Sequence, residues 1–303
     1  MSSESKITVE NIQRFICDQK NVRAVRFNSD GKYALTAGSD KTIKLWNPFK
    51  GLHLSTYSGD YGEILDVCSS RDNSTILSGG VSKNLLLHDV ETKRNIGRWL
   101  GHMAKINSVA FNDEGTVPFS ASQDGTVRCY DLRSKSKNPI QIFNEANDAI
   151  LCITVNNHEI ATGSADGKLR LYDIRKGQMF TDDFGHPVSS ISFSPDNQCL
   201  LVSVLNSNAI LLDKINGGAL LYFDTHKNAE YKLESCIMAS GIEVVTCSED
   251  GYLYIYNMLN GHVLNKCDHK PNLYIHSLAS HPKDSKILSA TGDTIFVWQL
   301  LNN

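Results

Sequence analysis

Short stretches in which apolar and polar residues alternate occur along the whole chain. The clearest lies in "GSDKTIKLWNP", where Ile43 and Leu45 flank Lys44 just before Trp46. A period of two places successive side chains on opposite faces of a β-strand. The pattern therefore predicts half-buried strands, and no segment predicts a helix.

The strand that ends at Trp46 recurs along the chain, with an aromatic or large residue at the same position of each copy. The intervals between these positions are 42, 42, 42, 40, 44 and 42 residues, and the positions are Trp46, His88, Tyr130, Tyr172, Leu212, Tyr256 and Trp298. A constant period of this length is typical of repeat architectures.

Two polar positions also recur in the repeats. A hydroxyl lies ten residues before the aromatic position at Thr36, Ser78, Ser120, Thr162 and Thr246, with Val202 in the fifth repeat and Ser289 one residue displaced in the seventh. A turn carboxylate lies six residues before it at Asp40, Asp124, Asp166 and Asp250, with Asp293 displaced likewise. Each repeat therefore predicts a four-stranded antiparallel meander, and seven of them predict an all-β, seven-bladed propeller.

The residues Gly101-His102 followed by Tyr130-Asp131, and Gly185-His186 further on, resemble the Gly-His…Trp-Asp pattern of the WD40 repeat family. This resemblance implies a hydrogen-bonded chain in each blade, complete in the third repeat with His102, Ser120, Asp124 and Tyr130. The fifth repeat has Val202, Asn206 and Leu212 at three of these places, and the second has His88 and Ser82. Since such a chain stiffens a blade only when its members are paired, we expect blades two and five to be the softest.

The ends of the chain predict how the ring closes. Few residues follow Trp298, so the last repeat has room for three strands, whereas "IQRFIC" (residues 12–17) has strand composition ahead of the first complete repeat. We expect this N-terminal strand to complete the last blade and leave no open edge. The predicted organisation is a short disordered tail at 1–10 and a propeller at 11–303.

Composition limits the cellular setting. The formal charge is −3, from 30 basic and 33 acidic residues, so there is no general electrostatic reason to expect direct nucleic-acid or membrane contact. No N-terminal secretion signal and no apolar run long enough to cross a bilayer occurs. The expected localisation is the cytoplasm and nucleus, with the eight scattered cysteines reduced and buried.

Catalytic and phosphate-binding motifs are absent from the sequence. There is no GxxxxGK[ST], GxGxxG, HExxH or GxSxG, and neither the cysteines nor the histidines have zinc-ligand spacing. We therefore expect no enzyme activity, no cofactor, no metal and no small-molecule substrate, and a catalytic propeller is the least favoured of the function classes.

Candidate partner-binding residues gather where the inner strands open onto the channel. Aromatic and arginine side chains at a rigid concave rim are typical interface anchors. For Tyr61 and Tyr231, packing between blades is an equal alternative. The candidates are Arg23, Tyr61, Lys105, Asn107, Tyr231, Glu234, Tyr274 and His276.

Two consecutive repeats end in Asp-x-Arg, at "YDLR" with Arg133 and "YDIR" with Arg175. These motifs resemble the box by which some WD40 propellers dock on a cullin-4 adaptor as substrate receptors. The alternative, which we favour because the motif is short and common in the family, is that both arginines satisfy turn carbonyls.

A finer resemblance rests on loops that the WD40 pattern leaves free: "VRAVRFN", "HEIATGSADGKLRLYDIRKGQMF" and "HKNAEYKL" (residues 22–28, 158–180 and 226–233). From about residue 11 onward the chain resembles the mitogen-activated protein kinase organizer group of WD40 proteins. This resemblance implies a non-enzymatic scaffold for components of the extracellular signal-regulated kinase cascade that is also associated with the spliceosome. The expected partners are proteins, namely kinase-cascade components and splicing factors, bound by a monomer within larger assemblies.

Overall fold

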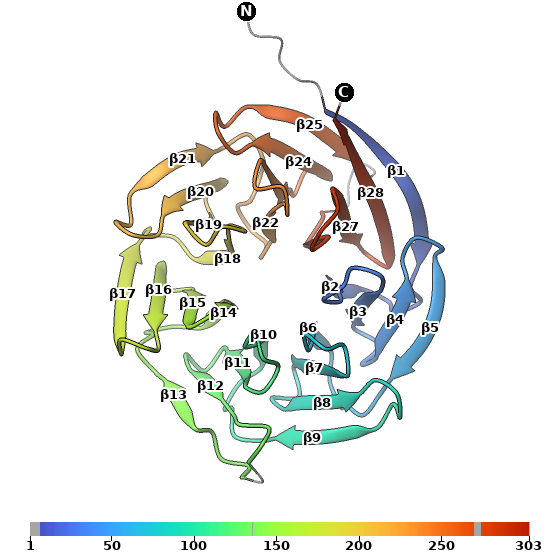
Figure 1. Ribbon diagram of the computed structural model, residues 1–303, viewed down its shortest axis with the longest axis vertical. Helices are drawn as coiled ribbons and strands as arrows, with labels where there is room; N and C mark the ends of the chain where they lie inside the picture. The colour runs from blue at the N-terminus through green and yellow to red at the C-terminus, as the bar shows by residue number, and fades with distance from the viewer. Residues whose placement is uncertain (1–6, 135, 270–273, 303) are drawn as a thin grey trace, which may run out of the picture.

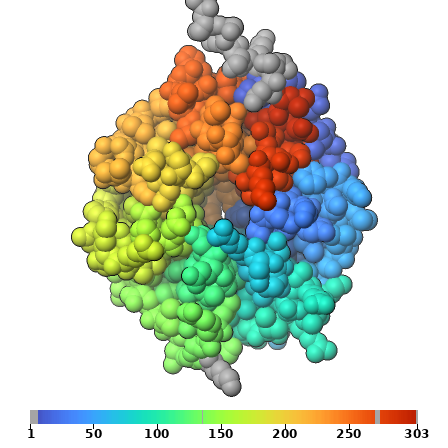
Figure 2. All heavy atoms as spheres, viewed as in Figure 1, coloured from blue at the N-terminus to red at the C-terminus, as the bar shows by residue number. Residues whose placement is uncertain are grey.

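The computed structural model describes residues 7–134, 136–269 and 274–302, and all regular structure within them is β. Seven four-stranded antiparallel sheets stand radially around a narrow central channel (Figures 1 and 2). The seven-bladed propeller that the repeat period predicts is thus confirmed. No helix long enough to cross a bilayer occurs in these residues.

Each blade runs from an inner strand at the channel to an outer strand at the rim. Blades one to three are β2 (Val22–Phe27), β3 (Ala34–Gly38), β4 (Ile43–Asn47) and β5 (Leu52–Tyr57); β6 (Ile64–Ser69), β7 (Thr75–Gly80), β8 (Leu85–Asp89) and β9 (Asn95–Trp99); and β10 (Ile106–Phe111), β11 (Pro118–Ser122), β12 (Val127–Cys129) and β13 (Gln141–Phe143). Blades four and five are β14 (Ile150–Asn156), β15 (Glu159–Ser164), β16 (Lys168–Asp173) and β17 (Gln178–Asp183), then β18 (Val188–Phe193), β19 (Cys199–Val204), β20 (Asn208–Asp213) and β21 (Ala219–Phe223). Blade six is β22 (Ser235–Ile237), β23 (Glu243–Cys247), β24 (Tyr252–Asn257) and β25 (Val263–Asp268), and blade seven combines β26 (Ser277–Ser280), β27 (Lys286–Thr291) and β28 (Thr294–Asn302) with β1 (Ile7–Ile16).

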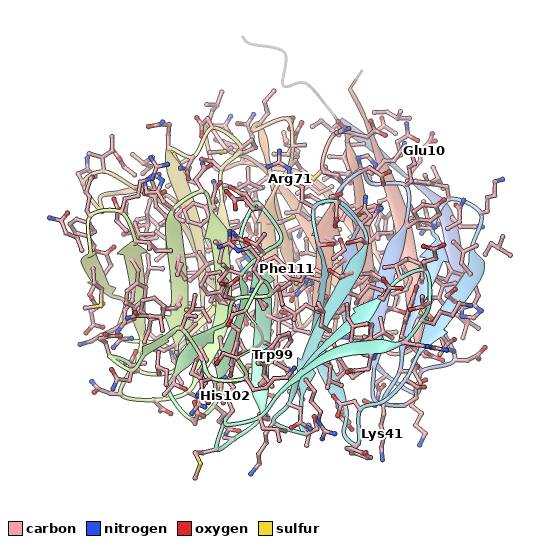
Figure 3. All side chains as sticks on the ribbon, turned by 60° about the horizontal axis from the view of Figure 1, so that its bottom comes forward. Glu10, Lys41, Arg71, Trp99, His102 and Phe111 are labelled. Atoms are coloured by element: carbon pink, nitrogen blue, oxygen red, sulfur yellow. The ribbon has the colours of Figure 1, made fainter. Side chains whose placement is uncertain are left out.

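The meander gives the molecule two different faces. The links between blades and the turns that carry the repeated aspartates share one face, which we call the link face. The opposite face, which we call the turn face, carries the turn between the first two strands of each blade and, in blades one to six, the turn between the last two strands. In Figure 3, Lys41 and His102 lie near the link face, and Arg71 and Glu10 lie near the turn face.

The ring is closed by the two ends of the chain. β1 pairs antiparallel with β28 from Ile7 opposite Asn302 to Ile16 opposite Thr294, so β1 is the outermost strand of blade seven (Figure 1). Beyond it, the Cys17 N–H donates to the Asp293 carbonyl at 2.9 Å. The predicted closure by an N-terminal strand is therefore confirmed.

The predicted boundary between tail and propeller needs a correction. β1 begins at Ile7 rather than after residue 10, because Ile7 is buried in an apolar cluster with Leu253 and Leu300, and the Asn265 side chain donates to its carbonyl at 2.9 Å. The rest of the predicted tail, residues 1–6, lies outside the described residues.

The apolar core lies between blades. The cluster at the closure is typical, because Phe15, Val22 and Trp46 pack there with Leu288 and Ile295 from the last repeat. The Phe15 and Trp46 rings lie 4.9 Å apart. Each blade thus buries its faces against its two neighbours, as expected of a repeat array.

The polar chain of blade three forms from three of its four predicted members. His102 contacts Asp124 through Nδ1 at 2.9 Å and Ser120 through Nε2 at 2.8 Å. Tyr130 is buried and packs on the Trp99 ring at 5.4 Å, but no hydrogen bond joins its hydroxyl to Ser120 within the described part of the chain.

The fourth link does form in the two blades whose aromatic residue is tryptophan. The indole N–H lies on the flank of a tryptophan ring, and Trp46 and Trp298 donate from there to Thr36 and Ser289 at 3.0 and 2.8 Å. A phenol carries its hydroxyl at the tip of the ring instead, and the Tyr256 hydroxyl lies 3.2 Å from His226 in the link.

Candidate protein-binding surface at the channel mouth

Most of the predicted partner-binding residues line one depression where the channel opens on the link face. Its volume is about 210 Å³. Of the eight candidates, Tyr61 alone is absent from its lining, which includes Arg23, Lys105, Asn107, Tyr231, Glu234, Tyr274 and His276.

An aromatic pair forms one wall of this mouth. The Tyr231 and Tyr274 rings stack in parallel, with centroids 4.3 Å apart and an interplanar angle of 5°. His276 meets the Tyr274 ring edge-on at 5.8 Å. The stack joins the links before blades six and seven, and because Tyr231 is still 44% exposed, it also forms a platform open to solvent.

The link that carries Tyr231 is held in place by one carboxylate. Glu249 accepts backbone hydrogen bonds from Ala229, Glu230 and Tyr231 at 2.8, 2.6 and 3.1 Å. Burial alone would raise the pKa of Glu249, but these three N–H groups hold it below its usual value. The long link of blade six is therefore ordered, and it presents the platform in a fixed position.

Basic groups surround the platform. Lys105 is exposed and makes no ion pair among the described residues, while Lys232 donates to the Asn107 carbonyl at 3.2 Å. Arg23 pairs with Glu63 at 3.1 Å, and both side chains are more than a third exposed. The mouth therefore offers ammonium and guanidinium groups beside two tyrosine rings.

Three of the predicted residues are occupied by the protein itself. The Asn107 amide donates to the Ile150 carbonyl at 2.8 Å, and the His276 ring contacts the Val22 carbonyl. Glu234 is bound by Arg26 and Ser277. The prediction of Glu234 as a partner-binding residue is not supported by this geometry, because its oxygens already accept from the chain.

Arg26, which the sequence analysis did not single out, lies at the centre of the channel. It contacts Asp66 of β6 at 2.8 Å and Glu234 at 2.6 Å. Asp66 in turn accepts from Ser108 at 2.8 Å, and Glu234 accepts from the Leu278 N–H at 3.0 Å. Although burial would raise the pKa of Glu234, the Arg26 guanidinium holds it below its usual range. We call Arg26, Asp66 and Glu234 the channel brace. Their ion pairs join blades one, two and six, and the hydrogen bonds from Ser108 and Leu278 extend these contacts to blades three and seven.

The remaining candidates lie elsewhere. Tyr61 is 73% exposed in the link before blade two, and the Arg98 guanidinium lies 5.3 Å from its ring centre. Arg133 and Arg175 follow β12 and β16 and are exposed on the turn face. The aspartates of the two motifs accept from the arginine backbone N–H groups, at 2.9 and 3.0 Å, and Arg133 also contacts Asp131 through Nε at 3.2 Å.

No group of three or more histidine, cysteine, aspartate or glutamate side chains placed to hold a metal ion occurs in the described ranges. All eight cysteines are free, and five of them are buried. Burial raises the pKa of Cys129 to about 11 and that of Cys267 to about 12.

A closed ring of seven meandering blades, with an aromatic and basic rim at one channel mouth, defines a β-propeller of the WD-repeat class, a fold that generally mediates protein–protein interaction. Residues 12–239 match the family profile of the nucleolar protein 10-like N-terminal domain, itself a β-propeller. The chain is 46% identical to WD repeat domain-containing protein 83 of Rattus norvegicus and 44% identical to that of Homo sapiens, in each case over 93% of this chain and 90% of the relative. The homolog in Dictyostelium discoideum is 34% identical over 92% of this chain and 94% of its own length. The chain therefore belongs to the WD repeat domain-containing protein 83 family.

Proposed function

We propose that the protein is a non-enzymatic scaffold whose channel mouth on the link face binds segments of partner proteins. The observation that carries the proposal is the Tyr231–Tyr274 platform, which Glu249 holds in place and which lines the same depression as Lys105. Rigid aromatic anchors lose little conformational entropy on binding, and such residues dominate interface energetics.

The finer proposal concerns the partners. The loop resemblance to the mitogen-activated protein kinase organizer group supports components of the extracellular signal-regulated kinase cascade and splicing factors, met in the cytoplasm and nucleus. A ring with several rigid loop surfaces raises the effective concentration of two bound partners without doing chemistry.

Proximity labelling in cells tests this function. A fusion of the wild-type protein should label kinase-cascade proteins, splicing factors or both, and Tyr231→Ala should reduce that labelling at least several-fold. The matched control is Tyr222→Ala, because Tyr222 is 59% exposed on the outer strand β21, away from the mouth. Equal labelling by all three proteins would reject the mouth as the binding surface, and enrichment of neither class would reject the proposed partners.

A second candidate is a substrate receptor of a cullin-4 ubiquitin ligase. The observation in its favour is that Arg133 and Arg175 are both exposed on the turn face, and that the Arg133 side chain contacts a carboxylate rather than a turn carbonyl. Affinity capture with Arg133→Ala/Arg175→Ala decides it. Loss of the cullin adaptor alone would support this candidate, and absence of the adaptor from the wild-type capture would reject it.

A further inference from the structure

Blade three departs from the other blades at its outer edge. β12 and β13 have three residues each, and residues 130–140 separate them, whereas residues 174–177 make the same connection in blade four. The described residues of this longer connection, 130–134 and 136–140, project outward beyond the ring in Figure 1. Because the outer hairpin of blade three is short, the flank of blade four beside it is left uncovered.

The uncovered flank forms a groove of about 750 Å³ between blades three and four. Its floor includes the buried side chains of Phe119, Cys129 and Ile160. Its walls include Ile140, Ile174 and Met179, which are 57%, 53% and 43% exposed. Single exposed apolar side chains are ordinary on a protein surface, but several converging on one hollow of this size are typical of a binding site.

The two ends of the groove carry opposite charges. Glu145 lies in the link after β13, toward the link face, and accepts from the Tyr172 hydroxyl at 3.1 Å. Arg175 lies in the turn after β16, toward the turn face, and its guanidinium makes no ion pair within the described residues. The nearest acid in sequence, Asp173, is already engaged by the Arg175 and Lys176 N–H groups at 3.0 Å each. Arg175 is therefore a positive charge available to a ligand at one end of an apolar hollow.

We propose that this groove binds a short extended segment of a partner protein, with apolar side chains seated between Ile140 and Met179 and an acidic side chain paired with Arg175. The volume suits a few residues rather than a folded element. The apolar contacts provide most of the affinity, and the ion pair fixes the direction of the segment. Since the channel mouth shares no residue with the groove, one molecule holds a partner at each place.

The test begins with a library of random twelve-residue peptides displayed on phage and selected on the immobilised wild-type protein. Enriched peptides are then synthesised with a fluorescein label and titrated by fluorescence anisotropy. We expect them to contain apolar residues next to an aspartate or glutamate. Met179→Glu should weaken their binding at least tenfold, and so should Ile174→Glu, a second wall variant.

Charge exchange tests the ion pair directly. Arg175→Glu should weaken binding about tenfold, and a peptide whose acidic residue is replaced by lysine should regain most of that loss on the Arg175→Glu protein. The matched control is Leu220→Glu, because Leu220 is 52% exposed on β21 outside the groove. Arg133→Ala is a second control, because Arg133 does not line the groove although it belongs to the Asp-x-Arg motifs. All the substituted side chains are exposed, so unchanged thermal melts confirm folding.

Three results would overturn the proposal: no enriched peptide, enriched peptides that bind Met179→Glu and Ile174→Glu as tightly as wild type, or no effect of Arg175→Glu. Tyr231→Ala separates this proposal from the scaffold function at the mouth. It should leave peptide binding at the groove unchanged while reducing proximity labelling, so either conclusion can fail without the other.

Discussion

At the scale of single residues, the same hydroxyl position is paired in one blade and unpaired in another. Ser120 contacts His102 at 2.8 Å, whereas the buried Ser78 hydroxyl has no hydrogen-bond partner among the described residues. A hydrogen bond contributes about 1 kcal/mol to stability, and a buried polar group without a partner costs free energy.

This difference predicts opposite outcomes for one substitution. Ser120→Ala should lower the free energy of unfolding by about 1 kcal/mol, while Ser78→Ala should leave it unchanged or raise it. Chemical denaturation of the two variants beside wild type measures both values. Equal destabilisation by the two would mean that Ser78 has a partner, such as a water molecule, that the blade depends on.

Buried histidines predict how stability depends on pH. Burial lowers the pKa of His226 and of His269 to about 4, against an ordinary value of 6.5. The unfolded chain therefore binds more protons between these values, so stability is fully present above about pH 6.5 and falls as the pH drops toward 4. At pH 5 each histidine should cost on the order of 2 kcal/mol relative to pH 7.

Chemical denaturation at pH 7 and at pH 5 measures this loss of stability. His269→Gln should be less stable than wild type at pH 7, because His269 contacts the Ser289 hydroxyl, but it should lose less stability on acidification. His262→Gln is the control, because His262 is exposed, and its pH dependence should match that of wild type. An unchanged pH slope in His269→Gln would contradict a low folded-state pKa.

At the scale of strands and blades, the repeat period is enough to predict all seven meanders, and the two ends of the chain predict the closing strand. Side-chain networks were less predictable, because they depend on which atom a residue presents. Gln19 takes the histidine's place in blade one, accepting from Thr36 and donating to Thr42, and no Gly-His pair marks that position. The carboxylate of Asp293, expected in its own blade's network, instead accepts from the Gln19 N–H at 2.8 Å across the closure.

The channel brace shows a further limit of sequence reasoning. Its three charged residues lie in or next to inner strands that are otherwise apolar, as in "VRAVRF" and "ILDVCS". A charged residue within an apolar strand is the sequence signal that indicates such a buried ion pair. Which charges meet depends on the ring bringing β2 and β6 close to the start of β22, and nothing within one repeat encodes that distance. The sequence accordingly predicts Glu234 as a partner-binding residue, whereas the structure pairs it with Arg26.

Blades two and five are still predicted to be the softest. In blade two, both Ser78 Oγ and His88 Nδ1 are buried without a partner in the described structure, and in blade five Val202 and Leu212 replace polar members. Hydrogen exchange followed by mass spectrometry should therefore show the fastest exchange for the hairpins β7–β8 and β19–β20 and slower exchange for β11–β12. Equal protection of all seven hairpins would contradict the prediction.

At the scale of the whole molecule, stability depends on the ring being closed. Each blade buries its apolar faces against its two neighbours, so a local defect should loosen the adjacent blades first and the opposite side last. Phe15 lies at the closure, packed on Trp46, while Phe223 packs on Tyr256 between blades five and six at a ring distance of 5.1 Å. The two phenylalanines are therefore matched probes of a closing contact and of an ordinary one.

Both Phe15→Ala and Phe223→Ala should cost about 3–5 kcal/mol, because each removes a buried aromatic ring from a packed cluster. The difference should lie in where the structure loosens. In Phe15→Ala, exchange should rise in β1, β28 and blade one, since β1 is held on one side only and its loss exposes the edge of β28. In Phe223→Ala it should rise in blades five and six, with β1 and β28 still protected. If Phe15→Ala instead accelerated exchange equally in all blades, the ring would be opening as one cooperative unit, and closure by β1 would stabilise every blade rather than the two it joins.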